Sequence, residues 1–402
     1  MTAPLMRQVK IRNYKSIAAC DVTLGPLMFM VGPNGAGKSN FLDALRFLSD
    51  SLRDSLYHAL RARGAIKEVR RRSGGHPNHF ALRYTFTLPS GQAGHYAFRI
   101  GAKQNGGYEV QDEECVVHSE NPLAPDHFFK IRSGAIVESS VQMLPAVVSD
   151  RLFLVNAAGL PEFRPVFDAL SRIEVYNLNP NVIASMQNPD SSELLRRDGG
   201  NAASVFHQLP DNIRIMINKN LSRIVPGITE AEAKTFGSQE TIEFRQAVKG
   251  QTHSWKFLAS AMSDGILRAF GILLAVFQAA SNRNGVPLLI GLEEPEIALH
   301  PAAASVLLSA LREGARHCQV LVTSHSPELL DNPDIPPESL LAVDNDDGLT
   351  RIGKIDKAGL ELLRDRSFTP GELLRMGQLS PDPSVISDAK DDKQMLFDLG
   401  KR

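Results

Sequence analysis

Residues 32–39, with the sequence GPNGAGKS, bring together the residue types that hold a phosphate chain. The spacing G-x-x-x-x-G-K-[ST] follows an apolar run and precedes a helical pattern, which is the context that this motif requires. Its glycines let backbone N–H groups turn inward around phosphate oxygens, while Lys38 reaches the β- and γ-phosphates and the Ser39 hydroxyl ligates Mg²⁺. The residues predicted to bind the nucleotide are Gly32, Asn34, Gly35, Gly37, Lys38, Ser39 and Asn40.

Two adjacent carboxylates, Glu293 and Glu294, end the apolar run LLIGL and form a second candidate group. We expect Glu293 to contact the metal, although aspartate is the usual residue there, and Glu294 to orient or deprotonate the attacking water. The alternative is a solvated loop after a strand. Glu296, two residues further on, is expected to be solvated or to stand at the start of a helix.

His325 lies just past the end of another apolar run, QVLVTS. An imidazole at that position can bond a γ-phosphate oxygen or the attacking water. A histidine at a strand end also has purely structural roles. Because the other motifs are present, we favour the nucleotide role.

Ser263 and Gly265 open a strongly apolar helical pattern and form a second candidate anion site. A hydroxyl and free N–H groups at a helix N-terminus bind phosphate well. One chain does not need two such sites for one γ-phosphate, whereas two chains facing each other do. Ser263 would then complete the site held by the partner's Lys38, and the alternative is an ordinary helix cap.

The elements that must position these residues follow from the hydrophobic pattern. Alternating residues predict two strands within 6–31 and an antiparallel meander over 79–110, while apolar residues at helical spacing predict a helix over 39–56. Two strands are expected near 231–245 and 247–258, and Trp255 and the phenylalanines are expected in the core. Two buried parallel strands flank a helix between residues 286 and 326, and another helix is expected near 357–376.

The fold class predicted is α/β, with a mostly parallel sheet carrying the phosphate loop, an antiparallel β lobe and a helical insertion. The expected divisions of a head over 1–383 are 1–64 (phosphate loop), 65–140 (β lobe), 141–230 (mainly helical insertion), 231–345 (Ser263, the carboxylates and His325) and 346–383 (C-terminal cap), followed by a loose tail over 384–402.

Composition sets limits on the class of protein. The 402 residues carry 44 basic and 45 acidic side chains, so global charge does not predict nucleic-acid binding. Three scattered cysteines argue against a disulfide framework. No window holds about 18 uninterrupted apolar residues and no signal peptide is evident, so we expect a cytoplasmic protein without membrane contact.

The order of these motifs, with the added segments GLEEPE (291–296), LHP (299–301) and TSHSPELL (323–330), resembles the ABC-type ATPases of the RecF/SMC/OLD-like branch. The resemblance covers residues 1–56 and 258–331, in the group without long coiled coils. It implies ATP and Mg²⁺ as cofactors and a homodimer, or a higher oligomer, that sandwiches two ATP molecules. It further implies that His300 lies near the partner's site. The glutamine that couples Mg²⁺ to the insertion stays open among Gln142, Gln187 and Gln208.

Other signals are weaker. The basic stretch 61–75 is either a stripe for DNA phosphates or a solvated face. Its basic residues are Arg61, Arg63, Lys67, Arg70, Arg71 and Arg72. HPNH (76–79) and CVVH (115–118) lack the four closely spaced ligands of a zinc site.

Two functions from different classes follow. The first is an ATPase that acts on duplex DNA or controls a separately encoded nuclease or toxin, in genome maintenance or anti-phage defence. The second is a nucleotide-sensing scaffold in which hydrolysis is incidental. A transporter ATPase fits less well, because of the long insertion and the LHP loop.

Overall fold

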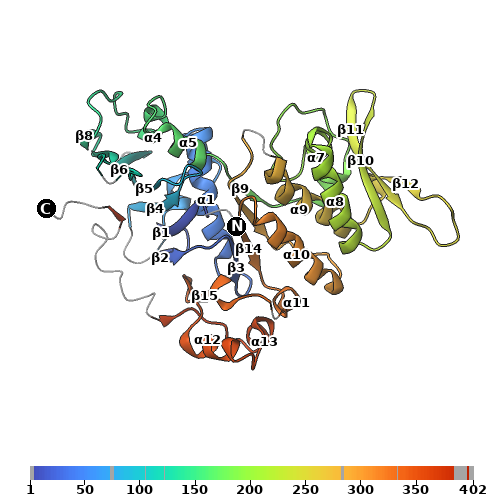
Figure 1. The fold of residues 1–402 in the computed structure, drawn as a ribbon. Coiled ribbons are helices and arrows are strands. Elements are labelled where there is room, and N and C mark those ends of the chain that lie inside the picture. The colour runs from blue at the N-terminus through green and yellow to red at the C-terminus, as the bar shows by residue number, and fades with distance from the viewer. Residues whose placement is uncertain are drawn as a thin grey trace.

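The computed structural model describes residues 4–72, 77–104, 106–121, 123–281, 285–332, 334–383 and 396–397. Within these residues thirteen strands form one continuous sheet (Figure 1). They are β1 (Met6–Tyr14), β2 (Ile17–Thr23), β3 (Leu27–Val31), β4 (His79–Thr87), β5 (Ala93–Ala102), β6 (Tyr108–Val117), β7 (His127–Arg132), β8 (Ala135–Ser139), β9 (Ile173–Tyr176), β13 (Leu289–Glu293), β14 (Gln319–Ser324), β15 (Leu340–Asp346) and β16 (Leu349–Gly353).

The large sheet changes character along its width. Its order is β8-β7-β6-β5-β4-β1-β2-β16-β15-β3-β14-β13-β9, and the run β15-β3-β14-β13-β9 is parallel throughout. The predicted α/β fold, with parallel strands beside an antiparallel lobe, is confirmed. Counted over the whole sheet, however, antiparallel pairs predominate, because β1 pairs with β4 and so joins the lobe to the same sheet.

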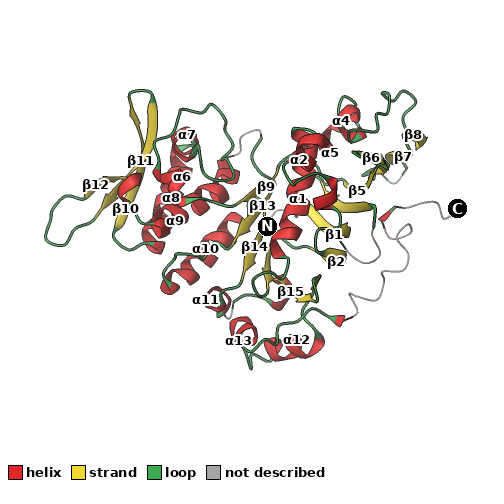
Figure 2. Cartoon of the chain, turned by 180° about the vertical axis from the view of Figure 1, so that it is seen from behind, coloured by secondary structure: helices red, strands yellow, loops and turns green. Residues whose placement is uncertain are grey.

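Helices cover the parallel strands and fill the insertion (Figure 2). They are α1 (Lys38–Arg53), α2 (Leu56–Arg61), α3 (Ile66–Val69), α4 (Phe153–Ala157), α5 (Arg164–Leu170), α6 (Pro180–Ala184), α7 (Ala202–Gln208), α8 (Asp211–Ile224), α9 (Asp264–Phe277), α10 (Ala304–Gly314), α11 (Pro327–Leu330), α12 (Lys357–Arg364) and α13 (Pro370–Arg375).

The parallel strands separate two hydrophobic cores. In β3, Met28 and Met30 point into the core that contains α1, whereas Phe29 and Val31 point into the core that contains α9 and α10. Both faces of these strands are therefore apolar, as expected for parallel strands buried between helices. This double burial fixes the carboxyl edge of the sheet, where the candidate site residues lie.

A second sheet stands at the far end of the molecule from the β lobe (Figure 1). It contains β10 (Ile228–Phe236), β11 (Gln239–Gln246) and β12 (Trp255–Leu258), where the sequence predicted two strands. The turn between Phe236 and Gln239, with Gly237 at a φ of 60°, divides the first predicted strand. The expectation of a core position for Trp255 is wrong, because 53% of its surface is exposed on the short strand β12.

One helical stretch, Asp264–Ser281, is long and apolar enough to cross a membrane. It comprises α9 and the turn after it, and 72% of it is buried inside the fold. Its burial between α8 and the parallel strands accounts for its composition, since a helix enclosed by protein is apolar on most sides.

Candidate nucleotide site

The phosphate loop connects β3 to α1 as the motif requires. Gly37 has a φ of 105°, a left-handed conformation that side chains rarely adopt, and a Cβ atom there would lie 2.1 Å from the Thr350 hydroxyl oxygen. The loop therefore needs glycine at this position for two independent reasons. Asn34 and Gly35, at the tip of the loop, are exposed.

Lys38 is held inside its own loop. Its Nζ donates to the carbonyl oxygens of Gly32, at 2.8 Å, and Pro33, at 3.0 Å, and only 5% of the residue is exposed. Burial lowers the pKa of Lys38, while Glu294 and Glu296 act in the opposite direction. A lysine bonded only to loop carbonyls can exchange them for phosphate oxygens without breaking an ion pair.

Ser39 and Glu293 meet across the carboxyl edge of the sheet. The exposed Ser39 hydroxyl donates to a Glu293 carboxylate oxygen at 3.2 Å. Burial raises the pKa of Glu293, and the hydrogen bond from Ser39 opposes that shift. A hydroxyl and a carboxylate oxygen in contact are the hard oxygen ligands that Mg²⁺ prefers, so these two residues fit the predicted metal site.

Glu294 adopts an unusual backbone conformation. Its φ is 44°, and its N–H donates to the carbonyl oxygen of Thr323 in the neighbouring strand at 3.0 Å. The left-handed conformation directs its carboxylate to His325, whose Nδ1 lies 2.9 Å from Glu294 Oε1. Backbone strain of this kind persists only where the surroundings impose it, and it occurs often at functional sites.

Glu296 differs from its expected solvated position. Ser324 donates to its Oε1 at 2.6 Å, whereas its Oε2 is buried without a partner among the described residues. Burial raises the pKa of this carboxyl, and the bond from Ser324 opposes the shift. The structure thus places Glu296 in the loop after β13, bonded to the last residue of β14.

Ser263 stands at the amino end of α9. It is the first residue before α9, it is exposed, and its side chain makes no capping hydrogen bond. A Cβ at Gly265 would lie 2.4 Å from the Ala298 carbonyl oxygen, so the loop after the carboxylates packs directly on this helix end. His300, in the same loop, is exposed and accepts from the N–H of Ala302.

Two residues that support the phosphate loop, Ser16 and Thr350, were missed by sequence reasoning. Asn40 donates from Nδ2 to the Ser16 hydroxyl at 2.6 Å, and Ser16 is 2.6 Å from the Thr350 hydroxyl. The turn after β1 and strand β16 thereby buttress the phosphate loop. The turn NYKS carries two non-glycine residues at positive φ, Asn13 and Lys15, but sequence alone does not reveal their conformation.

The three candidate glutamines have different environments. Gln187 is 5% exposed and is fixed by bonds to the Gly199 carbonyl and the Ala203 N–H, which leaves it no role at a metal. Gln208 donates to the Asp190 carbonyl oxygen, and Gln142 is exposed. A different amide, Asn177, follows β9 directly and is exposed beside Glu293, because Leu292 pairs with Tyr176 in neighbouring strands.

The basic stretch does not form one surface. The Arg63 guanidinium is buried against Asp43 and Asp50, whereas Arg72 pairs with Glu68 at the surface. Arg70 donates to the Pro77 carbonyl oxygen. His76 of the HPNH segment lies outside the described residues, and Cys115 is buried, so CVVH presents no cluster of ligands.

Comparison with known proteins identifies a family whose model matches most of this chain. A family model described as "AAA domain, putative AbiEii toxin, Type IV TA system" matches residues 27–132 and 159–331. The matched residues include the phosphate loop, Ser263, both adjacent carboxylates and His325.

Curated relatives are similar over very different lengths. An OLD nuclease of Thermus scotoductus is 22% identical over 382 residues, which are 90% of this chain and 67% of that protein. The DNA replication and repair protein RecF of Porphyromonas gingivalis is 50% identical over 46 residues, which are 11% of this chain and 13% of RecF.

Two solved SMC heads share the fold. One is bound to the C-winged helix domain of ScpA and has a TM-score of 0.56 at 15% identity, covering 89% of this chain and 99% of that chain. The other, from Pyrococcus furiosus, has an extended coiled coil and is bound to the C-terminal domain of ScpA. Its TM-score is 0.55 at 11% identity, covering 91% of this chain and 100% of that chain.

Proposed function

The chain belongs to the AAA-domain family of that description and to the RecF/SMC/OLD-like branch of ATPases, and from this premise we propose that it binds and hydrolyses Mg-ATP at Lys38, Ser39, Glu293 and Glu294. The observation that carries the proposal is the contact between Ser39 and Glu293, with Glu294 and His325 beside it. The Ser39 hydroxyl, the candidate metal ligand Glu293 and the candidate base Glu294 thus lie at one edge of the sheet.

Each residue has a role in the proposed reaction. Lys38 would exchange its loop carbonyls for oxygens of the β- and γ-phosphates. Ser39 and Glu293 would hold Mg²⁺, which would supply positive charge to neutralise the phosphates. Glu294 orients the attacking water or accepts its proton, and His325 positions the Glu294 carboxylate. The 2.9 Å contact between them supports this pairing.

The site is completed by a second copy of the chain. Ser263 is exposed, makes no capping bond and opens a helix whose first N–H groups favour an anion. We assign its hydroxyl to the ATP held by the partner's phosphate loop, so that two heads enclose two nucleotides. Hydrolysis then requires assembly.

Ser263→Arg tests this assignment. The variant should bind ATP as a monomer nearly as well as the wild type but should lose turnover, since the arginine blocks the facing copy. Ser260→Arg, three residues earlier and also exposed, is the matched control for added charge. Loss of ATP binding by the Ser263→Arg monomer would contradict a role in the partner's site.

The process that this ATPase serves is a second part of the proposal. The similarity to an OLD nuclease and to RecF supports a cytoplasmic role on duplex DNA or in control of a separately encoded nuclease or toxin. Replacing Arg70, Arg71 and Arg72 together should weaken duplex binding and reduce its salt dependence. ATP-driven assembly with no salt-dependent duplex binding would instead favour the scaffold function.

A further inference from the structure

The face of β4 and β5 that points away from α1 carries a small apolar patch. Leu82, Tyr84 and Phe98 point from these strands into the core under α1, so the alternating residues Ala81, Ala97 and their neighbours point the other way. The register pairs Ala81 with Arg99 and Arg83 with Ala97. Two alanines therefore form the patch, and two arginines flank it diagonally.

A pair of residues near the carboxyl end of the chain covers this patch. Leu396 and Phe397 are 1% and 3% exposed and cluster with Ala81 and Ala97. The short alanine side chains leave room for the two larger ones. The segment therefore buries both of its apolar side chains on a face that would otherwise present alanine to water.

Both arginines contact the segment directly. Arg83 Nη1 donates to the Leu396 carbonyl oxygen at 2.8 Å, and the Arg99 guanidinium lies 5.4 Å from the centroid of the Phe397 ring. A guanidinium over an aromatic face is an attractive cation–π arrangement. Arg83 thus binds the peptide backbone, and Arg99 contacts an aromatic side chain.

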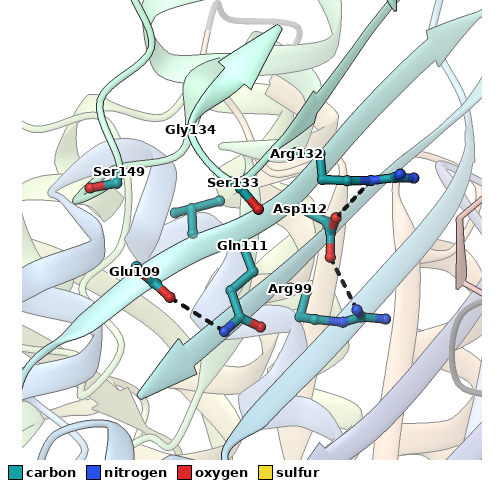
Figure 3. Close-up of a pocket in the computed structure, with 9 residues that line it drawn as sticks. Arg99, Glu109, Gln111, Asp112, Arg132, Ser133, Gly134 and Ser149 are labelled. Carbon is teal, nitrogen blue, oxygen red and sulfur yellow. Dashed lines mark hydrogen bonds and ion pairs between the residues drawn. The ribbon is translucent and has the colours of Figure 1, made fainter. Parts of the chain in front are cut away.

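Acidic residues of β6 hold these arginines in place. Asp112 accepts from Arg99 Nη1 at 3.1 Å and also pairs with Arg132, as Figure 3 shows beside a pocket of about 520 Å³. Glu114 lies 3.9 Å from Arg83 Nη1. The receiving surface is therefore built by β4, β5 and β6 and is independent of the segment that it binds.

We propose that this patch of two alanines flanked by two arginines is a docking site for a short peptide bearing adjacent leucine and phenylalanine. It is occupied by Leu396–Phe397 of the same chain and is open to a second copy of that segment once its own is removed. This docking site does not depend on the nucleotide site or on the proposed ATPase activity.

A free peptide must compete with the Leu396–Phe397 segment, which is linked to the same chain. Twelve residues separate Pro383 from Leu396, and a link of this length gives an effective concentration on the order of 1 mM. A free peptide at micromolar concentration therefore competes poorly with the tethered one. Emptying the site by mutation should restore binding of the free peptide.

The experiment titrates a fluorescein-labelled synthetic peptide of residues 386–402 into the full-length protein and follows its anisotropy. The Leu396→Ala/Phe397→Ala protein should bind the peptide at least ten-fold more tightly than the wild type does. A peptide carrying the same two alanines should bind neither protein. Equal affinity for both proteins, or no binding to the double variant, would overturn the proposal.

A receptor variant separates docking from general damage. Ala97→Leu replaces one alanine of the patch with a larger side chain, so in the double-variant background it should abolish peptide binding, whereas Thr85→Leu, on the same face of β4, should leave binding intact. Both variants should keep the melting temperature of the parent. Retained peptide binding by a folded Ala97→Leu protein would place the site elsewhere and contradict the proposal.

Discussion

Helix α1 contributes to two charged clusters that differ in how fully their charges are paired. At its first turn, Lys38 and Ser39 face the carboxyl edge of the sheet with Glu293, Glu294 and His325, which we name the edge cluster. Among the described residues, Lys38 bonds only loop carbonyls, and Ser39 is exposed. Charges in the edge cluster therefore have partners that a nucleotide and a metal can replace.

Further along α1, a second cluster pairs almost every charge, and we name it the arginine cluster. Its members are Asp43, Asp50, Arg63, Glu174 and Arg197. Arg63 contacts Asp43 at 2.8 Å and Asp50 at 3.0 Å, while Arg197 contacts Asp50 at 2.6 Å and Glu174 at 3.1 Å. Burial acts to raise the pKa of Asp43, but Arg63 and Lys15 together outweigh it and the pKa is lowered.

The contrast separates a reactive arrangement from a structural one. Removing one partner of a fully paired buried cluster leaves an uncompensated charge, so stability depends on the arginine cluster. In the edge cluster burial lowers the pKa of Lys38 and raises that of Glu293, so both groups lose part of their preference for the charged form. Phosphate and Mg²⁺ would restore that preference. Mutations should therefore affect stability at one cluster and activity at the other.

The largest effect is expected from Lys38→Ala. Removing the ammonium that holds the β- and γ-phosphates should reduce ATP turnover by roughly 10³-fold, because such a charge acts in a site shielded from water. Thermal stability should change little, since Lys38 bonds only two loop carbonyls. Turnover is measured by phosphate release; unchanged turnover would remove the loop from the mechanism.

Glu294→Gln should lower hydrolysis by roughly 10²–10³-fold, as expected when a general base is lost. ATP binding should persist because the phosphate loop is intact. A fluorescent ATP analogue measures binding separately from turnover. Glu296→Gln is the matched control among neighbouring carboxylates, and normal hydrolysis by Glu294→Gln would mean that the base lies elsewhere.

Arg63→Ala should destabilise the fold by about 3 kcal/mol, because the half-buried Asp43 and the buried Asp50 lose the partner that they share. Lys15 and Arg197 still pair with these two carboxylates and limit the loss. The measurement is urea unfolding followed by circular dichroism. Arg72→Ala, which removes an exposed pair with Glu68, should cost less than about 1 kcal/mol. Similar costs for the two variants would erase the distinction between the clusters.

The smallest effect concerns pH. Because burial raises the pKa of Glu293, protonation should compete with Mg²⁺ at a higher pH than at an ordinary glutamate. Mg²⁺-dependent nucleotide binding should weaken a few-fold as pH falls from about 8 to about 5. Glu293→Gln should bind Mg²⁺ weakly at every pH, and an equal pH slope in that variant would exclude Glu293 as the titrating ligand.

The residues of the edge cluster could be predicted from the sequence, whereas the ion pairs of the arginine cluster could not. The phosphate loop and the carboxylates are contiguous motifs whose spacing carries their chemistry. Arg63 and Arg197 gain their partners only through tertiary packing, and Arg63 was grouped with a possible DNA stripe because a charge run does not reveal burial. The contact between Ser16 and Thr350 joins residues 334 positions apart.

The hydrophobic pattern predicted which segments form strands and which form helices. It did not predict how the strands pair in the sheet. The meander and the helix α1 were predicted from periodicity alone. The pairing of β1 with β4, which joins the lobe to the main sheet, has no local signal. The docking of Leu396 and Phe397 was likewise not predicted, because the sequence indicates only a loose tail over residues 384–402.

The central claim is that two heads close around ATP, and the mass of the Glu294→Gln protein in solution tests it most directly. Light scattering after size-exclusion chromatography should give a monomer without nucleotide and twice that mass with Mg-ATP, because slowed hydrolysis keeps the closed pair assembled. A mass that is the same with and without Mg-ATP would contradict the account.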